Sequence, residues 1–144
     1  MDPYQSMTPI KNEFSRKLTI DQSIVGKENT ITANEAELDL LAKRFEVNKI
    51  YNIDATYIIT EKADIYGAYI LSMLLTSKVS KFVAGGTSED IDINEKFDVV
   101  LLDEDMARNN HEQLHNCDIE LFENGNIVDI GEIAAQYIAL CIFM

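Results

Sequence analysis

The sequence predicts an α+β fold with one twisted, mostly antiparallel sheet of about five to six strands and two packed helices. Segments in which apolar and polar residues alternate are separated by short polar turns, which favours antiparallel neighbours. Two other segments, Leu38–Phe45 and Ile130–Met144, repeat apolar residues at helical spacing. The chain has 144 residues, 47% hydrophobic and 26% charged, which is typical of a globular protein with one sizeable core.

The chain is predicted to begin with a loose N-terminal arm, residues 1–13, followed by a single α+β domain, residues 14–144. The arm contains both prolines, Pro3 and Pro9, and shows no apolar periodicity. The domain opens with Phe14–Ile20, where apolar and polar residues alternate as they do in an edge strand.

A helix is predicted after the short extended segment at residues 29–32. Its start has two candidate capping boxes, Thr32 with Glu35 and Asn34 with Glu37. The apolar positions that follow obey the i, i+3, i+4, i+7 rule and direct one stripe toward the core. These positions are Leu38, Leu41, Ala42 and Phe45.

Three further strands are predicted, at Tyr51–Thr60, Ile65–Leu75 and Ile91–Leu101. The second is apolar at nearly every position, which indicates a central strand buried on both faces, although its Leu, Met and Ala residues also fit a helix. Gly67 within it indicates a bulge or close packing. A bend or bulge is expected in the third strand at Asn94–Glu95.

The C-terminal part is predicted to form a hairpin followed by a helix. The strand Asp118–Phe122 leads into Asn124–Gly125, a pair typical of a type I′ turn because both central residues of that turn need positive φ. A second short strand follows. Asp129 is the expected N-cap of the helix, and Glu132 three residues later completes a capping box.

The net charge is −13, which argues against a broad nucleic-acid-binding surface. Residues 1–88 carry a net charge of −1, whereas residues 89–144 carry −12 and contain only two cations, Lys96 and Arg108. The protein should therefore be electrically lopsided, with its acidic side contributed by the second part of the chain. A purely solubilising acidic surface is the simpler interpretation of the same pattern.

The location expected from the sequence is the cytoplasm. The two cysteines, Cys117 and Cys141, make no disulfide framework, which fits a reducing compartment. No apolar run approaches the length of a membrane span, so no membrane contact is expected. No signal peptide is readable at the N-terminus.

One motif resembles a metal site. Residues 103–116 are polar and acidic, and we expect them to form a long exposed loop. Within them His111, Glu112 and His115 match H-E-x-x-H, which on a helix places two imidazoles on one face to bind zinc, with Cys117 close by. The surrounding asparagines are poor helix formers, so solvated histidines or weak metal binding remain the alternatives to a zinc hydrolase.

No catalytic residue, cofactor site or small-molecule substrate is predicted elsewhere. Gly85–Gly86 lacks the Lys-Ser/Thr of a phosphate-binding loop, and no nucleophile arrangement is recognisable. Four tyrosines on predicted strands could stack bases, but tyrosines of the core or sheet face are the simpler interpretation. They are Tyr51, Tyr57, Tyr66 and Tyr69. Six cations from three elements are candidates for RNA or phosphate contacts if the fold brings them together, and scattered solvated cations are the alternative. They are Arg16, Lys17, Lys43, Arg44, Lys78 and Lys81.

The block Asp-Ile-Gly-Glu-Ile-Ala-Ala-Gln-Tyr-Ile-Ala-Leu at residues 129–140 resembles the C-terminal signature of the YceD-like family, whose members are linked to accumulation of large-subunit ribosomal RNA. The order of features from Phe14 onward is similar to that of alphaproteobacterial members. The chain departs from the family at residues 76–79, which lack the cysteines that many relatives carry there, and at Gln136, where an acid is usual. No metal role therefore carries over.

The resemblance implies a non-enzymatic cytoplasmic factor that supports synthesis, processing or stability of large-subunit ribosomal RNA. Its partners would be ribosome-assembly or RNA-processing proteins, with direct RNA contact secondary because of the net charge. The signature residues Asp129, Gly131 and Glu132 are expected to be structural, since helix capping accounts for the two acids. The alternatives are a zinc-binding protein or small metallohydrolase built on residues 111–115, and an acidic adaptor unrelated to RNA.

Overall fold

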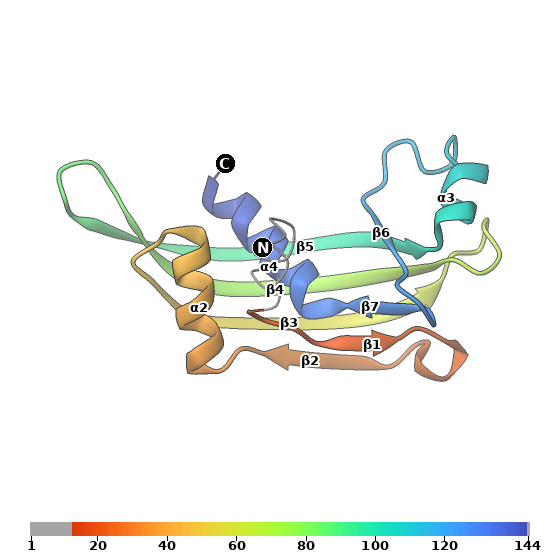
Figure 1. Cartoon of the computed structure of the whole chain (residues 1–144), viewed down its shortest axis with the longest axis horizontal. Coiled ribbons are helices and arrows are strands. Elements are labelled where there is room, and N and C mark those ends of the chain that lie inside the picture. Colours follow the sequence, from red (N-terminus) through yellow and green to blue (C-terminus); the bar gives the residue numbers. More distant parts are fainter. Residues whose placement is uncertain (1–12, 144) are drawn as a thin grey trace, which may run out of the picture.

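A computed structural model of the chain describes residues 13–143. The predicted α+β class is confirmed (Figure 1). The elements follow in the order β1 (Lys17–Thr19), η2 (Gln22–Ile24, a 3₁₀ turn), β2 (Glu28–Thr32), α2 (Glu35–Phe45), β3 (Lys49–Glu61), β4 (Tyr69–Phe82), β5 (Ser88–Leu102), α3 (Glu104–Asn109), β6 (Ile119–Leu121), β7 (Ile127–Asp129) and α4 (Ile130–Phe143).

The strands make a five-stranded sheet of order β2-β3-β4-β5-β6 and a separate two-stranded ribbon of β1 and β7. All pairs are antiparallel except β5 with β6, which is parallel. Figure 1 shows α2, α4 and β7 on the same side of the large sheet. None of the helices between residues 13 and 143 is long and apolar enough to cross a bilayer.

The main core lies between the large sheet and the two long helices. The inward residues of β3 and β4 alternate along each strand, as in Leu71, Met73 and Leu75, all at most 1% exposed. From the other side, Ala134 and Ile138 of α4 are fully buried against them. Helical spacing therefore placed Ala134 and Ile138 correctly, whereas the predicted burial of β4 on both faces is wrong, because Leu74 on its other face is 44% exposed.

A second, smaller core corrects the prediction for residues 103–116. Six of these residues form α3, and Leu114 is buried with Ile65 and Leu102, with Met106 packed against them. The predicted exposed loop is therefore wrong, because the few apolar residues of this polar stretch cover the end of the sheet.

Both strands of the hairpin are longer than predicted, and β4 begins later in the sequence than predicted. β4 extends from Tyr69 to Phe82, while Ile65 belongs to the preceding turn, where it is apolar because it enters the second core. Gly67 lies in that turn with φ +85 rather than in a strand bulge, and the alternative of close packing holds, because an added Cβ would lie 3.2 Å from Met106 Sδ. No bend interrupts β5 at Asn94–Glu95, since its register with β4 is continuous, and the irregularity falls in β3 next to Tyr51 instead.

The predicted C-terminal hairpin is also wrong. β6 pairs with β5 and β7 pairs with β1, so the two strands join different sheets and only Glu123 and Ile127 bridge them. The positive φ values fall at Gly125 and Asn126 rather than at Asn124 and Gly125. The Asn-Gly signal thus located the turn, but the strands that leave it diverge.

The first helix uses the second of its two candidate starts. Asn34 accepts from the Glu37 backbone N–H and Glu37 returns a bond to the Asn34 N–H, each 2.9 Å long, which completes the capping box. The predicted edge strand is observed only at Lys17–Thr19. The predicted arm, residues 1–13, lies outside the described residues except for Glu13.

Candidate functional site

The residues of the H-E-x-x-H motif do not form a helical zinc site. His111 and His115 lie in turns after α3 and both are exposed, as is Cys117. Within residues 13–143 no group of three His, Cys, Asp or Glu side chains is placed to hold a metal ion. The motif requires a helix to align its two imidazoles, and the asparagines around it end α3 before the motif begins.

Asp129 ties the first strand to the last helix. Its carboxylate accepts from the Ser15 hydroxyl at 2.8 Å and the Arg16 backbone N–H at 2.8 Å. It also accepts from the Glu132 N–H at 3.1 Å, which is the expected N-cap bond of α4. The Glu132 carboxylate does not return to the Asp129 N–H as a capping box requires, but pairs with Arg44 of α2.

The backbone at Phe14 crosses the start of α4 at Gly131. A Cβ at this position would lie 2.2 Å from the Phe14 carbonyl oxygen, far inside van der Waals contact. The Phe14 side chain is itself fully buried, so this backbone has no room to retreat. In this structure all three signature residues, Asp129, Gly131 and Glu132, hold the N-terminal segment and α2 to α4.

The two arginines among the candidate RNA contacts are bound to carboxylates of this chain. Arg16 makes a two-pronged pair with Glu37, with both N–O distances 2.7 Å. Arg44 pairs with Glu132 at 2.8 Å and lies 3.4 Å from Glu13. Hydrogen bonding to Glu37 raises the pKa of Arg16, and hydrogen bonding to Arg16 lowers the pKa of Glu37.

The four lysines among the candidates lie on three elements, with Lys17 on β1, Lys43 on α2, and Lys78 and Lys81 on β4. Lys17 is 3.6 Å from Glu123, and Lys78 is 4.0 Å from Asp90. Lys81 donates to the Ile142 carbonyl at the C-terminal end of α4, where a cation is favoured. Lys43 is exposed on α2. The six cations therefore do not assemble into one phosphate-binding surface.

The exposed charge gathers instead on β5. This strand carries five exposed acids and a single cation, Lys96. Among the described residues Asp90 is the one acid of this strand within salt-bridge distance of a cation. The five are Glu89, Asp90, Asp92, Glu95 and Asp98.

The face of the large sheet opposite α4 carries a shallow apolar groove of about 200 Å³. Ile58 and Leu74 line it, the latter 44% exposed, with Lys96 of β5 at one side. The side chains of Asp92 and Asp98 project on this same face, because the register places them opposite Lys78 and Ser72. Along β5, Asp92 lies four residues before Lys96 and Asp98 lies two residues after it. The groove is thus bordered by the acids of β5.

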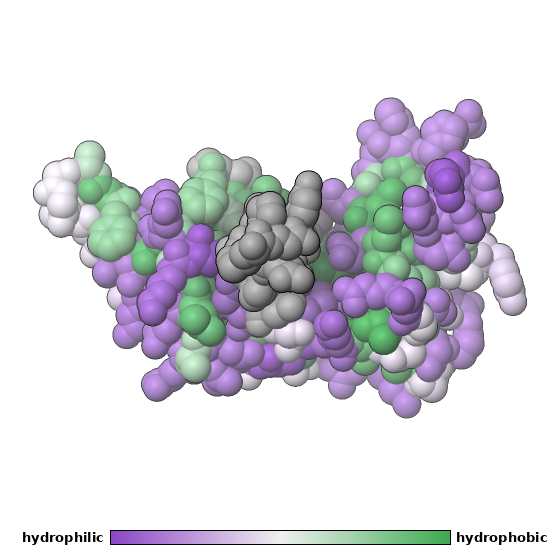
Figure 2. Space-filling view, viewed as in Figure 1, coloured by the Kyte–Doolittle hydropathy of each residue, from purple (hydrophilic) through white to green (hydrophobic). Residues whose placement is uncertain are grey.

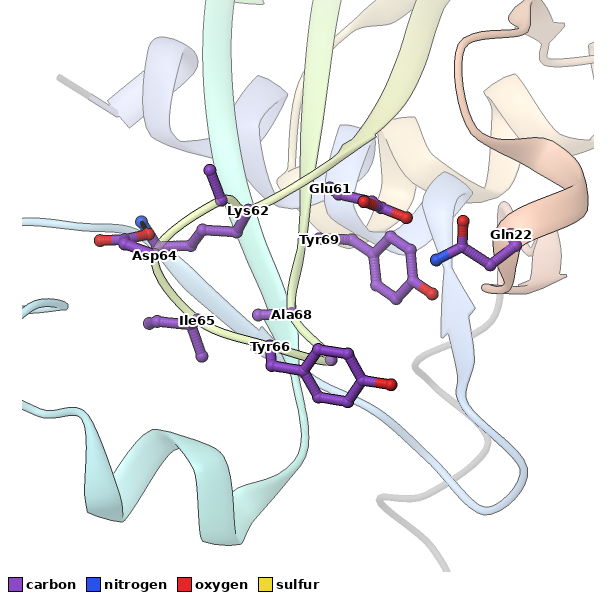
Figure 3. A pocket seen from close by; sticks show the side chains of 10 residues that line it. Gln22, Glu61, Lys62, Asp64, Ile65, Tyr66, Ala68 and Tyr69 are labelled. Carbon is purple, nitrogen blue, oxygen red and sulfur yellow. Dashed lines mark hydrogen bonds and ion pairs between the residues drawn. The ribbon is translucent and has the colours of Figure 1, made fainter.

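A hollow of about 570 Å³ lies at the turn between β3 and β4 (Figure 3). Its ten lining residues include no His, Cys, Ser or Thr, and its titratable side chains are Glu61, Lys62, Asp64, Tyr66 and Tyr69. Lys62 is occupied by Asp64 at 2.7 Å. Figure 3 shows the Tyr69 ring beside Glu61 and Gln22, and the Tyr66 ring projecting from the turn.

Hydrophobic surface is spread over both ends of the molecule in Figure 2. At one end is the tip of the β4–β5 hairpin, where Phe82 is 60% exposed. Of the four tyrosines considered for base stacking, Tyr57 and Tyr69 are buried in the core, whereas Tyr51 and Tyr66 are exposed. The two exposed rings lie at opposite ends of β3, so they form no stacking platform.

A second hollow of about 210 Å³ lies where β6, β5 and α4 meet, a site that sequence reasoning missed. The Tyr137 hydroxyl donates to Asp118, and its ring stacks on Phe97 with centroids 3.6 Å apart. Burial, followed by the bond to Asp118, raises the pKa of Tyr137. Burial, followed by the nearby Glu132 carboxylate, raises the pKa of Glu120. The parallel pairing of β6 creates this junction, and the sequence carries no signal for that pairing.

No family model, curated protein or solved structure matches this chain. The resemblance to the YceD-like family therefore remains a prediction based on residues 129–140 and the order of elements.

Proposed function

We propose that this protein is a non-enzymatic cytoplasmic factor that supports synthesis, processing or stability of large-subunit ribosomal RNA by binding a basic protein partner. The ribosomal role follows from the resemblance of residues 129–140 to the YceD-like signature. The mode of action follows from the distribution of charge over the fold.

One observation carries the proposal: the arginines expected to face phosphates bind this chain's own carboxylates, whereas the carboxylates of β5 face solvent. A phosphate that engaged Arg16 or Arg44 would have to displace Glu37 or Glu132. Each displaced carboxylate would then lie partly buried beside a bound anion, which costs energy. Direct binding of the RNA backbone is therefore disfavoured.

A basic protein surface meets no such obstacle. The five acids of β5 lie along one strand, so their potentials add over its length and attract a cationic partner. The apolar groove beside Leu74 adds apolar surface whose removal from water favours binding. Together these features favour binding of a partner that combines basic and apolar side chains.

The test is depletion of the protein in its native cells, followed by complementation. Depletion should lower the ratio of large- to small-subunit ribosomal RNA, and the parent chain should restore it. A chain carrying Asp92→Asn and Asp98→Asn should restore it less well. The matched control carries Glu35→Gln and Asp39→Asn, which remove the same charge from the exposed side of α2 and should restore the ratio fully.

An unchanged ratio after depletion would contradict the ribosomal role. If partners still bound through β5 in that case, the protein would be an acidic adaptor outside ribosome assembly.

A further inference from the structure

The outer edge of β5 is open along most of its length. β5 has 15 residues, but β6 pairs only with Val100, Leu101 and Leu102 at its C-terminal end. In Figure 1, β5 forms the border of the sheet from the hairpin tip to β6. Within residues 13–143 no other strand pairs with this edge.

The backbone groups that point to this edge follow from the register. The Val100 backbone N–H donates to the Asp118 carbonyl, and the Leu102 carbonyl accepts from the Phe122 N–H. The even-numbered residues of β5 therefore turn their N–H and C=O groups toward the open edge. The pairing of β5 with β4 continues without a shift back to Ser88, and the alternation continues with it. Unpaired N–H and C=O groups are therefore presented by Asp90, Asp92, Asn94, Lys96 and Asp98. Such a row is a template for another strand.

The side chains around the edge define what a strand placed there would meet. On the face toward α4 it would lie near Leu140, 57% exposed, and Ile119, 38% exposed. Both residues line the 210 Å³ hollow at the end of the open edge. On the opposite face it would lie beside the carboxylates of Asp90, Asp92 and Asp98, with the Lys96 side chain between the last two. The exposed Glu95 also projects toward α4. A bound strand would thus have one mostly apolar face and one basic face.

We propose that the β5 edge, Asp90–Asp98, binds an extended segment of a basic protein by adding it to the sheet as a further strand. Main-chain hydrogen bonds to the even-numbered residues would supply affinity. Apolar residues of the segment pack toward Leu140, and lysines or arginines of the segment face Asp92 and Asp98. The basic nature of the partner rests on the function proposed above, whereas the open edge does not.

A second copy of the chain fits this edge poorly. Two β5 edges side by side would bring ten exposed acids and two lysines onto one seam, and like charges across a strand pair are destabilising. The same acids that prevent self-pairing attract a basic strand. Charge complementarity therefore selects the partner.

The test uses an acetylated peptide of about eight alternating lysine and valine residues, titrated into the full chain and followed by fluorescence anisotropy. A peptide of identical composition with its lysines and valines in two blocks is the control for charge alone. An alternating peptide N-methylated on its backbone tests the hydrogen bonds. Only the unmodified alternating peptide should bind tightly, with backbone amides of β5 becoming protected from hydrogen exchange.

Two variants localise the site. Asn94→Pro removes one outward N–H and should weaken binding about tenfold or more, while Asn94→Ala keeps that N–H and should bind within about twofold of the parent. Proline is compatible with an edge strand where its nitrogen faces outward. Should Asn94→Pro fail to fold, the N-methylated peptide on the parent chain decides the same question.

Three results would overturn the proposal: equal binding of alternating and blocked peptides, equal binding of the two Asn94 variants, or β5 edge amides already protected in the free chain. The last would mean that this edge is occupied by the chain itself or by a second copy, which sedimentation distinguishes. The ribosomal RNA ratio is a separate readout. A normal ratio after depletion together with strand addition would remove the proposed function and leave the binding edge.

Discussion

Replacing Gly131 with alanine is expected to destabilise the fold, because the added methyl group would meet the backbone of the first strand segment. The Cβ would lie 2.2 Å from the Phe14 oxygen and 3.1 Å from the Arg16 nitrogen. Neither atom belongs to a flexible side chain. The segment is also fixed by the bonds of Asp129 to Ser15 and Arg16, so relief requires moving the strand or the helix.

Two opposing effects set the magnitude. Alanine in place of glycine inside a helix is worth about 1 kcal/mol of stability by intrinsic propensity. Overpacking costs about 1–3 kcal/mol, and displacing the fully buried Phe14 ring adds part of the roughly 3–5 kcal/mol that a buried Phe side chain contributes. The net loss should be about 2–4 kcal/mol, which lowers Tm by about 6–15 °C in a chain of this size.

Chemical and thermal unfolding measure this loss directly. Gln136→Ala, an exposed change on the same helix, is the control and should stay within about 0.5 kcal/mol of the parent. The sign of the change in unfolding free energy for Gly131→Ala shows whether the Phe14 backbone lies against this position. A stabilisation near 1 kcal/mol would mean that Gly131 is an ordinary helical glycine and that the segment at Phe14 does not cross it as described.

Three further changes test the capping and the electrostatics by unfolding measurements. Asn34→Ala should cost about 1 kcal/mol by removing the N-cap of α2, and no loss would contradict that cap. Glu37→Gln should destabilise the fold at neutral pH. Because Arg16 lowers the pKa of Glu37 in the folded state, this loss of stability should shrink as the pH falls below about 4. A loss that does not depend on pH would refute the ion pair as its cause. Glu120→Gln should have the opposite effect: burial raises the pKa of Glu120, so its charged form weakens the fold. The variant should therefore be more stable than the parent at neutral pH but not at about pH 4. Equal stability of variant and parent at both pH values would contradict the burial of Glu120.

Local signals in the sequence predicted those parts of the fold that depend on neighbouring residues. The stripe from Leu38 to Phe45 and the cap at Asp129 need only helical spacing and hydrogen-bonding groups a few residues apart. Alternation located β3 and most of β5 for the same reason. The α+β class follows from these elements together.

Features that depend on long-range pairing were not predictable. The Asn124–Gly125 turn was visible, but nothing local tells that β6 continues to β5 and β7 to β1, which are far apart in the sequence. Likewise Ile65 could be read as a strand residue, because its burial comes from the distant Leu114 rather than from its own neighbours. Register and partner choice are set by packing across the whole chain.

The candidate sites divide in the same way. The lopsided charge was visible in the sequence, since it needs only counting, and the structure adds that five of those acids lie along β5. The ion pairs of Arg16 with Glu37 and Arg44 with Glu132 join residues 21 and 88 positions apart, so the sequence left both arginines as candidates for phosphate contact. The main change that the structure makes is that Arg16 and Arg44 are no longer candidates for phosphate contact.

The central claim, that this protein acts through a protein partner held by its acidic strand, is tested most directly by affinity purification of the full chain from native cells with and without nuclease. The account predicts that the same basic proteins remain bound after nuclease treatment and that Asp92→Asn with Asp98→Asn releases them. Loss of those proteins on nuclease treatment, with retention by the neutralised variant, would show that RNA bridges the interaction and would contradict the account.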